Sequence, residues 1–418
     1  MNALNSVAIL NPLGDFGINA YSFELAEGLC AAGVSVDVYV NGASPLSVLP
    51  AARRHRCFPV LGSVLLKQDL KTGFRAEAES SLLPSLLPST STVNAEPGRQ
   101  RAPLFRERAR QKFLEIELAA HLRRKRYDLV WTQWPEIYGH GFWATCRRLG
   151  LKTVHTVHNV LPHEENPEDV TLLRKVYGNC DRLIVHSEQS RQELLRLFPD
   201  VAARASVMRH GLYTIYPRRT GARERVRGEL QIGPAKIVCL ICGGIRPYKN
   251  IDSCLRALSE LPKDVLLIVA GKESGFEASS KEDSLAHTRR RARECGVEDS
   301  VRLIPRALGR LEMAELFEAA DLLLLPYLKG YGSGLLLLGM TFRKYIVTTD
   351  TGGASEYLRN YPNSNLLARG DSAELAGGIR EGIRTLQDGT QSAETTALEE
   401  LQWTTIARNS LQIISSGC

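Results

Sequence analysis

Short apolar runs alternate with amphipathic stretches along nearly the whole chain. The runs are continuous, which is typical of strands buried on both faces of a parallel sheet. They form one series before residue 212 and a second after residue 235. The predicted strands cover residues 6–11, 34–40, 128–134, 152–159, 182–188 and 205–211, then 236–244, 264–271, 300–306, 322–327, 344–350 and 365–370.

Helical patterns separate these strands. The clearest cover residues 20–32, 188–198, 251–261, 283–295, 310–320 and 335–342. Strands that alternate with helices indicate the α/β class, and two series of them predict two Rossmann-like, doubly wound domains.

The length of 418 residues suits two domains of ~200 residues each better than one core. We place an N-terminal domain at 1–213, because the pattern breaks in segment 211–220, and a C-terminal domain at 214–395. Residues 396–418 are predicted to form a helical tail near the domain junction. A stretch rich in Ser, Pro and Thr predicts a mobile insert at about 76–105 in the first domain.

The chain has no apolar run of ~18 residues, and its first ten residues lack the basic start of a signal peptide. Nine cysteines without regular spacing do not form a disulfide framework. Cys239 and Cys242 make one CxxC inside an apolar run, which predicts a buried strand rather than a metal site. We therefore expect a cytoplasmic protein.

Basic residues gather in segment 99–126, with ten Lys or Arg against three Glu, an excess equal to the net charge of +7 of the whole chain. A solvated helix face accounts for such a segment. So does a surface that attracts anionic lipid headgroups at ~1 kcal/mol per basic residue. No nucleic-acid-binding motif accompanies it. We expect no nucleic acid partner, and peripheral contact with an anionic membrane is the functional reading.

A glycine pair with two cations follows the first strand of the second domain. Gly244 precedes Arg246 and Lys249, which lie three residues apart where a helix begins. Cations beside a helix N-terminus suit a diphosphate, although a surface turn with solvated charges is the alternative.

Further along the same domain, Gly332, Ser333 and Gly334 open a helix directly after a strand. Their backbone N–H groups could hold a phosphate. Glu356 follows the next strand, after a Gly-Gly pair. Its carboxylate either accepts hydrogen bonds from sugar hydroxyls or simply provides negative charge at a helix N-terminus.

In the first domain, Gly14 and Gly17 lie in the loop after the first strand, where they allow close approach of a ligand or a tight turn. His155 and His158 fall on opposite faces of one strand, so they are not joint metal ligands. We expect His155 in the core and His158 at the ligand-binding rim. Trp134 ends a strand on the same rim, as a sugar platform or a core residue.

No DxD motif or other metal-binding pattern occurs, so we predict no metal and no cofactor. Arg246 and Lys249 could neutralise a departing diphosphate instead.

These residues resemble a known family. The resemblance rests on the stretches GGIRPYKN, LLIVAGKE, AADLLLLPY and GYGSGLLLLGM…IVTTDTGGASE, together with HTVHNVLPHE and WTQWPE. They are similar to glycosyltransferases of the GT-B fold, family 4, of the bacterial polysaccharide-assembly type. The resemblance implies two domains facing an interdomain cleft and a nucleotide-diphosphate sugar, UDP- or GDP-linked, as donor substrate.

It also implies roles for the candidate residues. Arg246 and Lys249 would hold the diphosphate, which the loop ending at Gly334 would cap. Gly14 and Gly17 would lie beneath the donor sugar, His158 would contact it, and Glu356 would lie near the ribose or the sugar. The family's usual pair of glutamates with seven residues between them is absent, with Gly330 and Leu338 at the corresponding positions.

The sequence thus predicts a retaining, metal-independent hexosyltransferase acting on a glycan or lipid-linked acceptor, cytoplasmic or peripheral at the inner membrane face. Two alternatives stay open. A nucleotide-sugar epimerase has a similar double-Rossmann shape, and the missing glutamates allow a non-catalytic binding or partner subunit.

Overall fold

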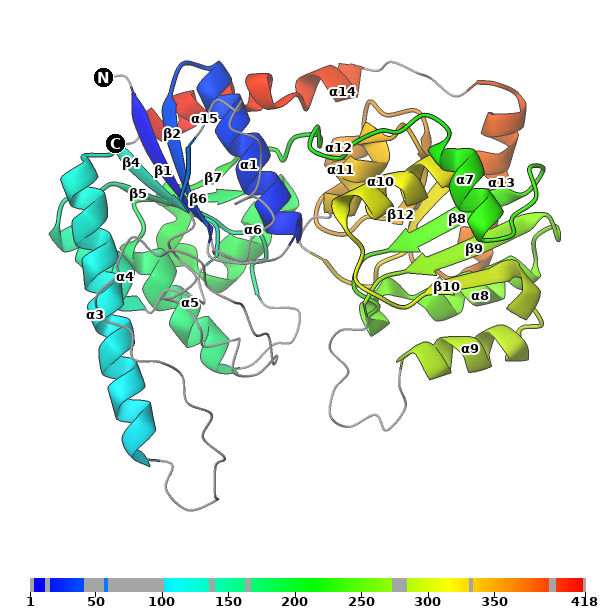
Figure 1. Ribbon diagram of the computed structural model, residues 1–418, viewed down its shortest axis with the longest axis horizontal. Coiled ribbons are helices and arrows are strands. Elements are labelled where there is room, and N and C mark those ends of the chain that lie inside the picture. The colour runs from blue at the N-terminus through cyan, green and yellow to red at the C-terminus, as the bar shows by residue number, and fades with distance from the viewer. Residues whose placement is uncertain are drawn as a thin grey trace.

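The computed structural model describes residues 4–11, 16–40, 56–58, 101–134, 140–161, 167–272, 284–330, 334–390 and 396–415. Within these residues the chain forms two parallel sheets, each with helices on both faces, in two lobes that lie side by side (Figure 1). The structure therefore confirms the predicted α/β class with two Rossmann-like domains.

The first sheet has the strand order β3-β2-β1-β4-β5-β6-β7. Its strands are β1 (Ser6–Asn11), β2 (Ser35–Val40), β3 (Arg56–Phe58), β4 (Leu129–Thr132), β5 (Thr153–Thr156), β6 (Arg182–Val185) and β7 (Ala205–Val207). The prediction missed β3, because an edge strand of three residues is too short to carry a periodic pattern. The helices around this sheet are α1 (Phe16–Ala31), α3 (Arg101–Lys125), α4 (His140–Arg148), α5 (Pro167–Asn179) and α6 (Glu188–Leu197).

Alternating side chains of β1 show why the strand is apolar throughout. Val7 and Ile9 pack in the core beneath α1, whereas Ala8 and Leu10 pack on the opposite face with residues of α3 and α4. All four side chains are completely buried. Both faces of the sheet are thus covered, as a parallel sheet requires.

The second sheet has the order β10-β9-β8-β11-β12-β13, and it contains all six predicted strands. They are β8 (Ile237–Cys242), β9 (Val265–Ala270), β10 (Val301–Ile304), β11 (Leu322–Leu325), β12 (Tyr345–Thr349) and β13 (Ser364–Leu367). The helices of this domain are α7 (Ala222–Glu229), α8 (Ile251–Ser259), α9 (Ser284–Glu294), α10 (Arg310–Ala319), α11 (Gly334–Thr341), α12 (Ala354–Leu358) and α13 (Ser372–Gln387).

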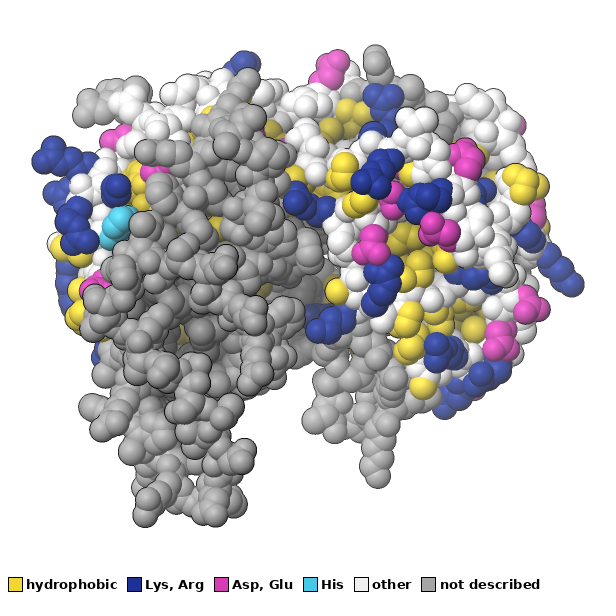
Figure 2. Space-filling view, in the orientation of Figure 1, with side chains coloured by type: hydrophobic (Ala, Val, Ile, Leu, Met, Phe, Trp, Pro, Cys, Tyr) yellow, Lys and Arg dark blue, Asp and Glu magenta, His cyan; other side chains and the backbone are white. Residues whose placement is uncertain are grey.

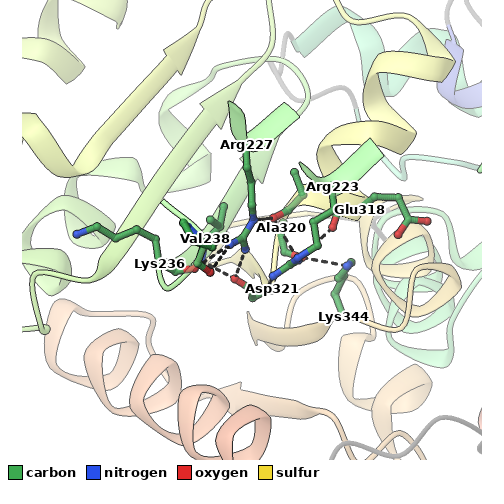
Figure 3. Close-up of polar contacts among 10 residues, drawn as sticks. Arg223, Arg227, Lys236, Val238, Glu318, Ala320, Asp321 and Lys344 are labelled. Carbon is green, nitrogen blue, oxygen red and sulfur yellow. Dashed lines mark hydrogen bonds and ion pairs between the residues drawn. The ribbon is translucent and has the colours of Figure 1, made fainter. Parts of the chain in front are cut away.

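An ion-pair cluster fastens α7 to the second sheet (Figure 3). One carboxylate oxygen of Asp321 accepts from Arg223 at 2.6 Å, and the other accepts from Arg227 and from the backbone N–H of Val238, both at 2.7 Å. Lys344 donates to the carbonyl group that follows α10, at 2.9 Å. Asp321, Val238 and Lys344 lie where β11, β8 and β12 begin. The cluster therefore stabilises the edge of the sheet opposite the carboxyl ends of its strands.

The end of the chain returns to the first domain. Helices α14 (Thr396–Glu400) and α15 (Trp403–Ser415) cross the junction, and α15 packs along α1 (Figure 1). Trp403 donates from its indole nitrogen to the carbonyl of Leu212 at 2.6 Å. A Cβ at Gly28 would lie 2.7 Å from the carbonyl oxygen of Trp403, so the close approach of the two helices requires glycine there.

A buried carboxylate on α1 holds the linker between the two sheets. Glu24 is 1% exposed. It accepts hydrogen bonds from the hydroxyl of Thr214 at 2.9 Å and from the backbone N–H of Ile215 at 2.7 Å. Burial raises the pKa of Glu24 to about 6. The linker is therefore anchored to the first domain just after the predicted boundary.

The predicted domain limits stay a prediction, although the gap between β7 and β8 brackets the boundary. Most of the predicted insert at 76–105 lies outside the described residues. Its last part, from Arg101, is the start of α3.

Candidate active site

The turn after β8 carries the predicted cationic motif. Gly243 has a φ of 83°, a left-handed conformation that favours glycine. A Cβ at this position would also lie 3.2 Å from Nζ of Lys249. Gly244 and Arg246 lie on the same turn, both partly exposed. The sequence around Gly243 thus lets Lys249 fold back against the end of β8.

Lys249 is a buried cation that has no ion-pair partner among the described residues. Its side chain is 2% exposed, and Nζ donates to the carbonyl of Cys242 and to the hydroxyl of Tyr327, the latter at 3.4 Å. Within the described residues no carboxylate pairs with it. Burial lowers the pKa of Lys249 to about 8. A cation held in this way is stabilised when an anion binds beside it.

The N-terminus of α11 adjoins this lysine. The side chain of Leu335, in the first turn of α11, lies 3.2 Å from the position of a Cβ on Gly243. Gly334, which opens α11, would bring a Cβ within 2.6 Å of the hydroxyl of Tyr213. Gly332 and Ser333 lie outside the described residues. Lys249 and the positive end of α11 therefore meet at one corner, where a phosphate is favoured by charge and dipole.

Glu356, the predicted sugar contact, lies at the domain interface. Its carboxylate accepts from the backbone N–H groups of Glu188 and Gln189, at 2.9 and 3.0 Å, and so caps the N-terminus of α6 in the other domain. A Cβ at Gly353 would lie 2.4 Å from Cβ of Ser187, which shows how closely the domains approach. In this arrangement Glu356 acts as negative charge at a helix N-terminus.

The two positions of the missing glutamates differ in their surroundings. Leu338 is 1% exposed and belongs to the hydrophobic core beneath α11. A Cβ at Gly330 would make ordinary contacts with Thr351 and Tyr327, at 3.6 and 4.0 Å. A charge at position 338 would be desolvated. Packing therefore excludes a carboxylate from position 338, whereas position 330 has room for a side chain.

At the rim of the first domain, His158 follows β5. Its Nε2 lies 3.0 Å from Oε1 of Gln133, at the end of β4, and its ring meets the edge of Tyr21 with centroids 4.8 Å apart. Burial holds the pKa of His158 well below its usual range. His158 is therefore a neutral hydrogen-bonding group at the carboxyl edge of the sheet, where open α/β folds bind ligands.

Two further histidines share this site. His186 and His210 also pack against Tyr21, with ring centroids 5.1 and 4.9 Å away. His210 reaches the hydroxyl of Tyr213 at 3.1 Å with Nε2. The three histidines thus form a continuous path from the rim of the first domain to the start of α11.

The remaining candidates are less informative. His155 is completely buried and packs with Trp143 and Tyr177, away from Tyr21, which confirms the predicted core position on the opposite face from His158. Gly17 is exposed, and a Cβ there would meet nothing within 4 Å. Gly14 lies outside the described residues. Trp134 is partly exposed, but its indole nitrogen is buried.

The CxxC motif is structural. Cys239 and Cys242 are free, buried residues of β8, and burial raises the pKa of Cys242 to about 12. These thiols are therefore unreactive. In the part of the chain that the structure describes, no group of three or more His, Cys, Asp or Glu side chains is arranged to hold a metal ion.

Several residues of the site were not predicted, namely Tyr21, Gln133, His186, His210 and Tyr213. Gln133 and His186 end strands that the sequence did identify, and that position alone could have marked them. Tyr213 lies in the linker, where no periodic pattern exists. Its place beside α11 follows only from the packing of the two domains.

Two family models match consecutive parts of the chain. Glycosyltransferase Family 4 matches residues 17–214, and Glycosyl transferases group 1 matches residues 222–387. D-inositol 3-phosphate glycosyltransferase of Mycobacterium ulcerans (strain Agy99) is 28% identical over 278 residues, which are 64% of this chain and 58% of that protein. The match thus spans little more than half the length of that relative. D-inositol 3-phosphate glycosyltransferase 2 of Catenulispora acidiphila is 23% identical over 398 residues, 90% of this chain and 84% of that protein.

Solved structures share the fold over the full length. The Anabaena protein HepE, in complex with UDP and glucose, superposes with a TM-score of 0.69 at 15% identity and covers 99% of this chain and 100% of its own. Sucrose-phosphate synthase from Thermosynechococcus elongatus gives a TM-score of 0.66 at 18% identity, covering 99% and 98%. At such identities the likeness establishes the fold. With both family models and this fold in agreement, the chain belongs to the GT-B glycosyltransferases, with a Glycosyltransferase Family 4 domain followed by a group 1 domain.

Proposed function

We propose that this protein transfers a hexose-type sugar from a nucleoside-diphosphate donor to a saccharide or lipid-linked acceptor. The observation that carries the proposal is the environment of Lys249, a buried cation with a lowered pKa and no carboxylate partner in the described residues. It lies beside the N-terminus of α11, where a second source of positive potential favours an anion. A diphosphate would pair with the buried cation and would be favoured by the positive end of α11.

The donor is proposed to carry uridine or guanosine. The solved structures of HepE contain UDP or UDP-glucose, which supports a nucleotide sugar of this size in a fold of this kind. The nucleotide would bind mainly on the second domain, because the cationic turn and α11 belong to it.

Catalysis would depend on positioning and on stabilising the leaving diphosphate. Lys249, Arg246 and the amide groups that begin α11 would hold the phosphates, so we propose transfer without a divalent cation. His158, neutral at pH 7, would accept or donate a hydrogen bond to the donor sugar from the opposite domain. Family membership supports retention of the anomeric configuration, which NMR of the product would test.

A thermal-shift panel tests the donor site. We expect one of the UDP-, GDP-, ADP- or dTDP-sugars to stabilise the protein by ~2.7 kcal/mol at about 100 times its dissociation constant. Chromatography of the donor after incubation alone separates the alternatives. An isomerised nucleotide sugar would point to an epimerase, and the absence of any shift would point to a non-catalytic subunit.

We propose that α3 contacts an anionic membrane surface at the cytoplasmic face. Phe113 and Ile116 lie three residues apart on one helix face, and each is 53% exposed. Basic side chains, beginning with Arg123, follow in the last turn of the helix. Figure 2 shows dark blue atoms in this region, along the edge of the first lobe. Within the described residues, no helix has the length and apolar character needed to cross a bilayer. A basic surface that also exposes apolar side chains suits peripheral binding to a membrane.

The double variant Phe113→Ser and Ile116→Ser should weaken binding to vesicles of phosphatidylcholine with phosphatidylserine by about tenfold, since partial burial of two such side chains is worth ~1.4 kcal/mol or more. Vesicle co-sedimentation at low and high salt measures this. The matched control is Leu366→Ser, an exposed apolar residue of the second domain (45% exposed). Equal binding by all three proteins, or binding that ignores salt, would contradict the proposal.

A further inference from the structure

Gln133 has a buried side-chain amide whose oxygen has a hydrogen-bond partner and whose nitrogen, within the described residues, has none. It is 0% exposed and directly follows β4. Oε1 lies 3.0 Å from Nε2 of His158, but Nε2 of Gln133 has no partner in the described residues. A buried donor without a partner costs stability, because its bond to water is lost and not replaced. Such a cost is expected where a ligand supplies the missing acceptor.

A second amide at the same edge repeats the pattern. The side chain of Asn11 donates to Oδ1 of Asn19 at 2.5 Å, while Nδ2 of Asn19 lacks a partner within the described residues. Asn11 ends β1, and the backbone N–H of Gln133 bonds to the preceding carbonyl of β1, that of Leu10, at 3.1 Å. Two amide donors without a partner in the described residues, one directly after β4 and one in the first turn of α1, indicate a hydroxyl-rich ligand rather than an isolated packing defect.

A series of packed aromatic rings, beginning at His158, connects this edge to the corner where Lys249 and the start of α11 meet. Ring centroids are 5.3 Å apart for His158 and His186, 5.4 Å for His186 and His210, and 5.1 Å for His210 and Tyr213. The hydroxyl of Tyr213 then meets the start of α11. A sugar joined to a diphosphate at α11 would therefore lie between that helix and the rim that carries Gln133.

We propose that Gln133 binds the donor sugar and positions His158. One amide atom holds the imidazole of His158, and the other makes a hydrogen bond to a hydroxyl of the hexose. With Oε1 facing His158, Nε2 donates to the hydroxyl. In the reversed amide orientation, with the other tautomer of His158, Nε2 donates to His158 and Oε1 accepts a hydrogen bond from the sugar hydroxyl. The proposal rests on the proposed function, because it assumes a nucleotide-sugar donor.

The test compares a nucleoside diphosphate with its hexose derivative by calorimetry, beginning with UDP and UDP-glucose. Gln133→Met keeps the length of the side chain but removes the amide. It should weaken the affinity for UDP-glucose about tenfold and change the affinity for UDP less than twofold. Gln133→Glu serves as a second variant, since it keeps an oxygen for His158 but has no N–H donor. UDP-deoxyglucose analogues then identify the hydroxyl. Wild type should discriminate against one of them, and Gln133→Met should not.

The matched control is Thr132→Val. This neighbouring residue is equally buried, and its hydroxyl bonds to the carbonyl of Val154 and to Nδ1 of His155 rather than to the rim. It should leave the ratio of the two affinities unchanged. Equal weakening of UDP and UDP-glucose by Gln133→Met would show a merely structural residue and overturn the proposal, as would wild-type affinity for both. If wild type binds none of the nucleotide pairs of the panel, the proposed function itself fails.

Discussion

Replacing Lys249 with methionine is expected to lower kcat/KM for sugar transfer by about 10²–10³-fold, the usual effect of removing one group that stabilises developing charge. Methionine fills a similar volume, so the turn after β8 should persist. The loss arises because Arg246, the other cation of this turn, is partly exposed and does not take the buried position of the ammonium group. Steady-state kinetics with the donor selected by the panel measures it.

Lys344 provides the control for this variant. Burial likewise lowers its pKa to about 8, but it lies at the opposite edge of the same sheet, in the cluster around Asp321 (Figure 3). Lys344→Met should lower stability and change kcat/KM less than twofold. If both variants lost activity to the same extent, the effect would belong to the fold of the domain and the assignment of Lys249 would be wrong.

Acid is expected to destabilise the first domain progressively between pH 7 and pH 5. His155, His186 and His210 are at most 7% exposed, and burial lowers their pKa values to about 3, 4 and 3. In the unfolded chain they titrate at about 6.5. Below that pH the unfolded state binds more protons than the native state, so stability is lost as the pH falls.

Glu24 acts in the opposite direction. Its native pKa of about 6 exceeds the unfolded value, so between these values the native state holds the extra proton. The three histidines lower the free energy of unfolding as the pH falls, and the one glutamate raises it. At ~1.4 kcal/mol per proton and pH unit, the net decrease between pH 7 and pH 5 is about 4–5 kcal/mol. This loss is comparable with the whole stability of a typical domain.

Urea titrations from pH 5 to pH 7.5 measure this dependence. His155→Asn keeps a polar atom near Thr132 but removes one titrating group, and it should reduce the slope of stability against pH by about one proton. The same slope in both proteins, or stability that rises on acidification, would show that these histidines are not the acid-sensitive groups.

Much of the fold could be predicted because parallel strands that are covered on both faces appear as apolar runs. Val7 to Leu10 and the strand ending in Cys242 are unmistakable for this reason. The edge strand β3 could not be found, since three residues carry no period. The close packing of α15 on α1 could not be found either. It depends on the fit of Gly28 against Trp403, which the sequence places far apart.

The residues of the proposed donor site in the second domain could be named from the sequence, whereas fewer of those in the first domain could. Gly243, Arg246 and Lys249 are close in sequence, so their chemistry is visible as a motif. The partners of Glu356 are backbone groups of α6 in the other domain, and Gln133 meets His158 only through the pairing of β4 with β5. Contacts of this kind follow from sheet register and domain packing, which a linear pattern does not specify.

The most direct test of the central claim is a calorimetric titration of wild type with the nucleoside diphosphate of the donor at pH 7 and pH 9. If a diphosphate binds beside Lys249, only the protonated amine binds it well, so a native pKa of about 8 predicts binding about tenfold weaker at pH 9. Lys249→Met should bind weakly at both pH values. Affinity that is the same at pH 7 and pH 9, or no binding at either, would contradict the account.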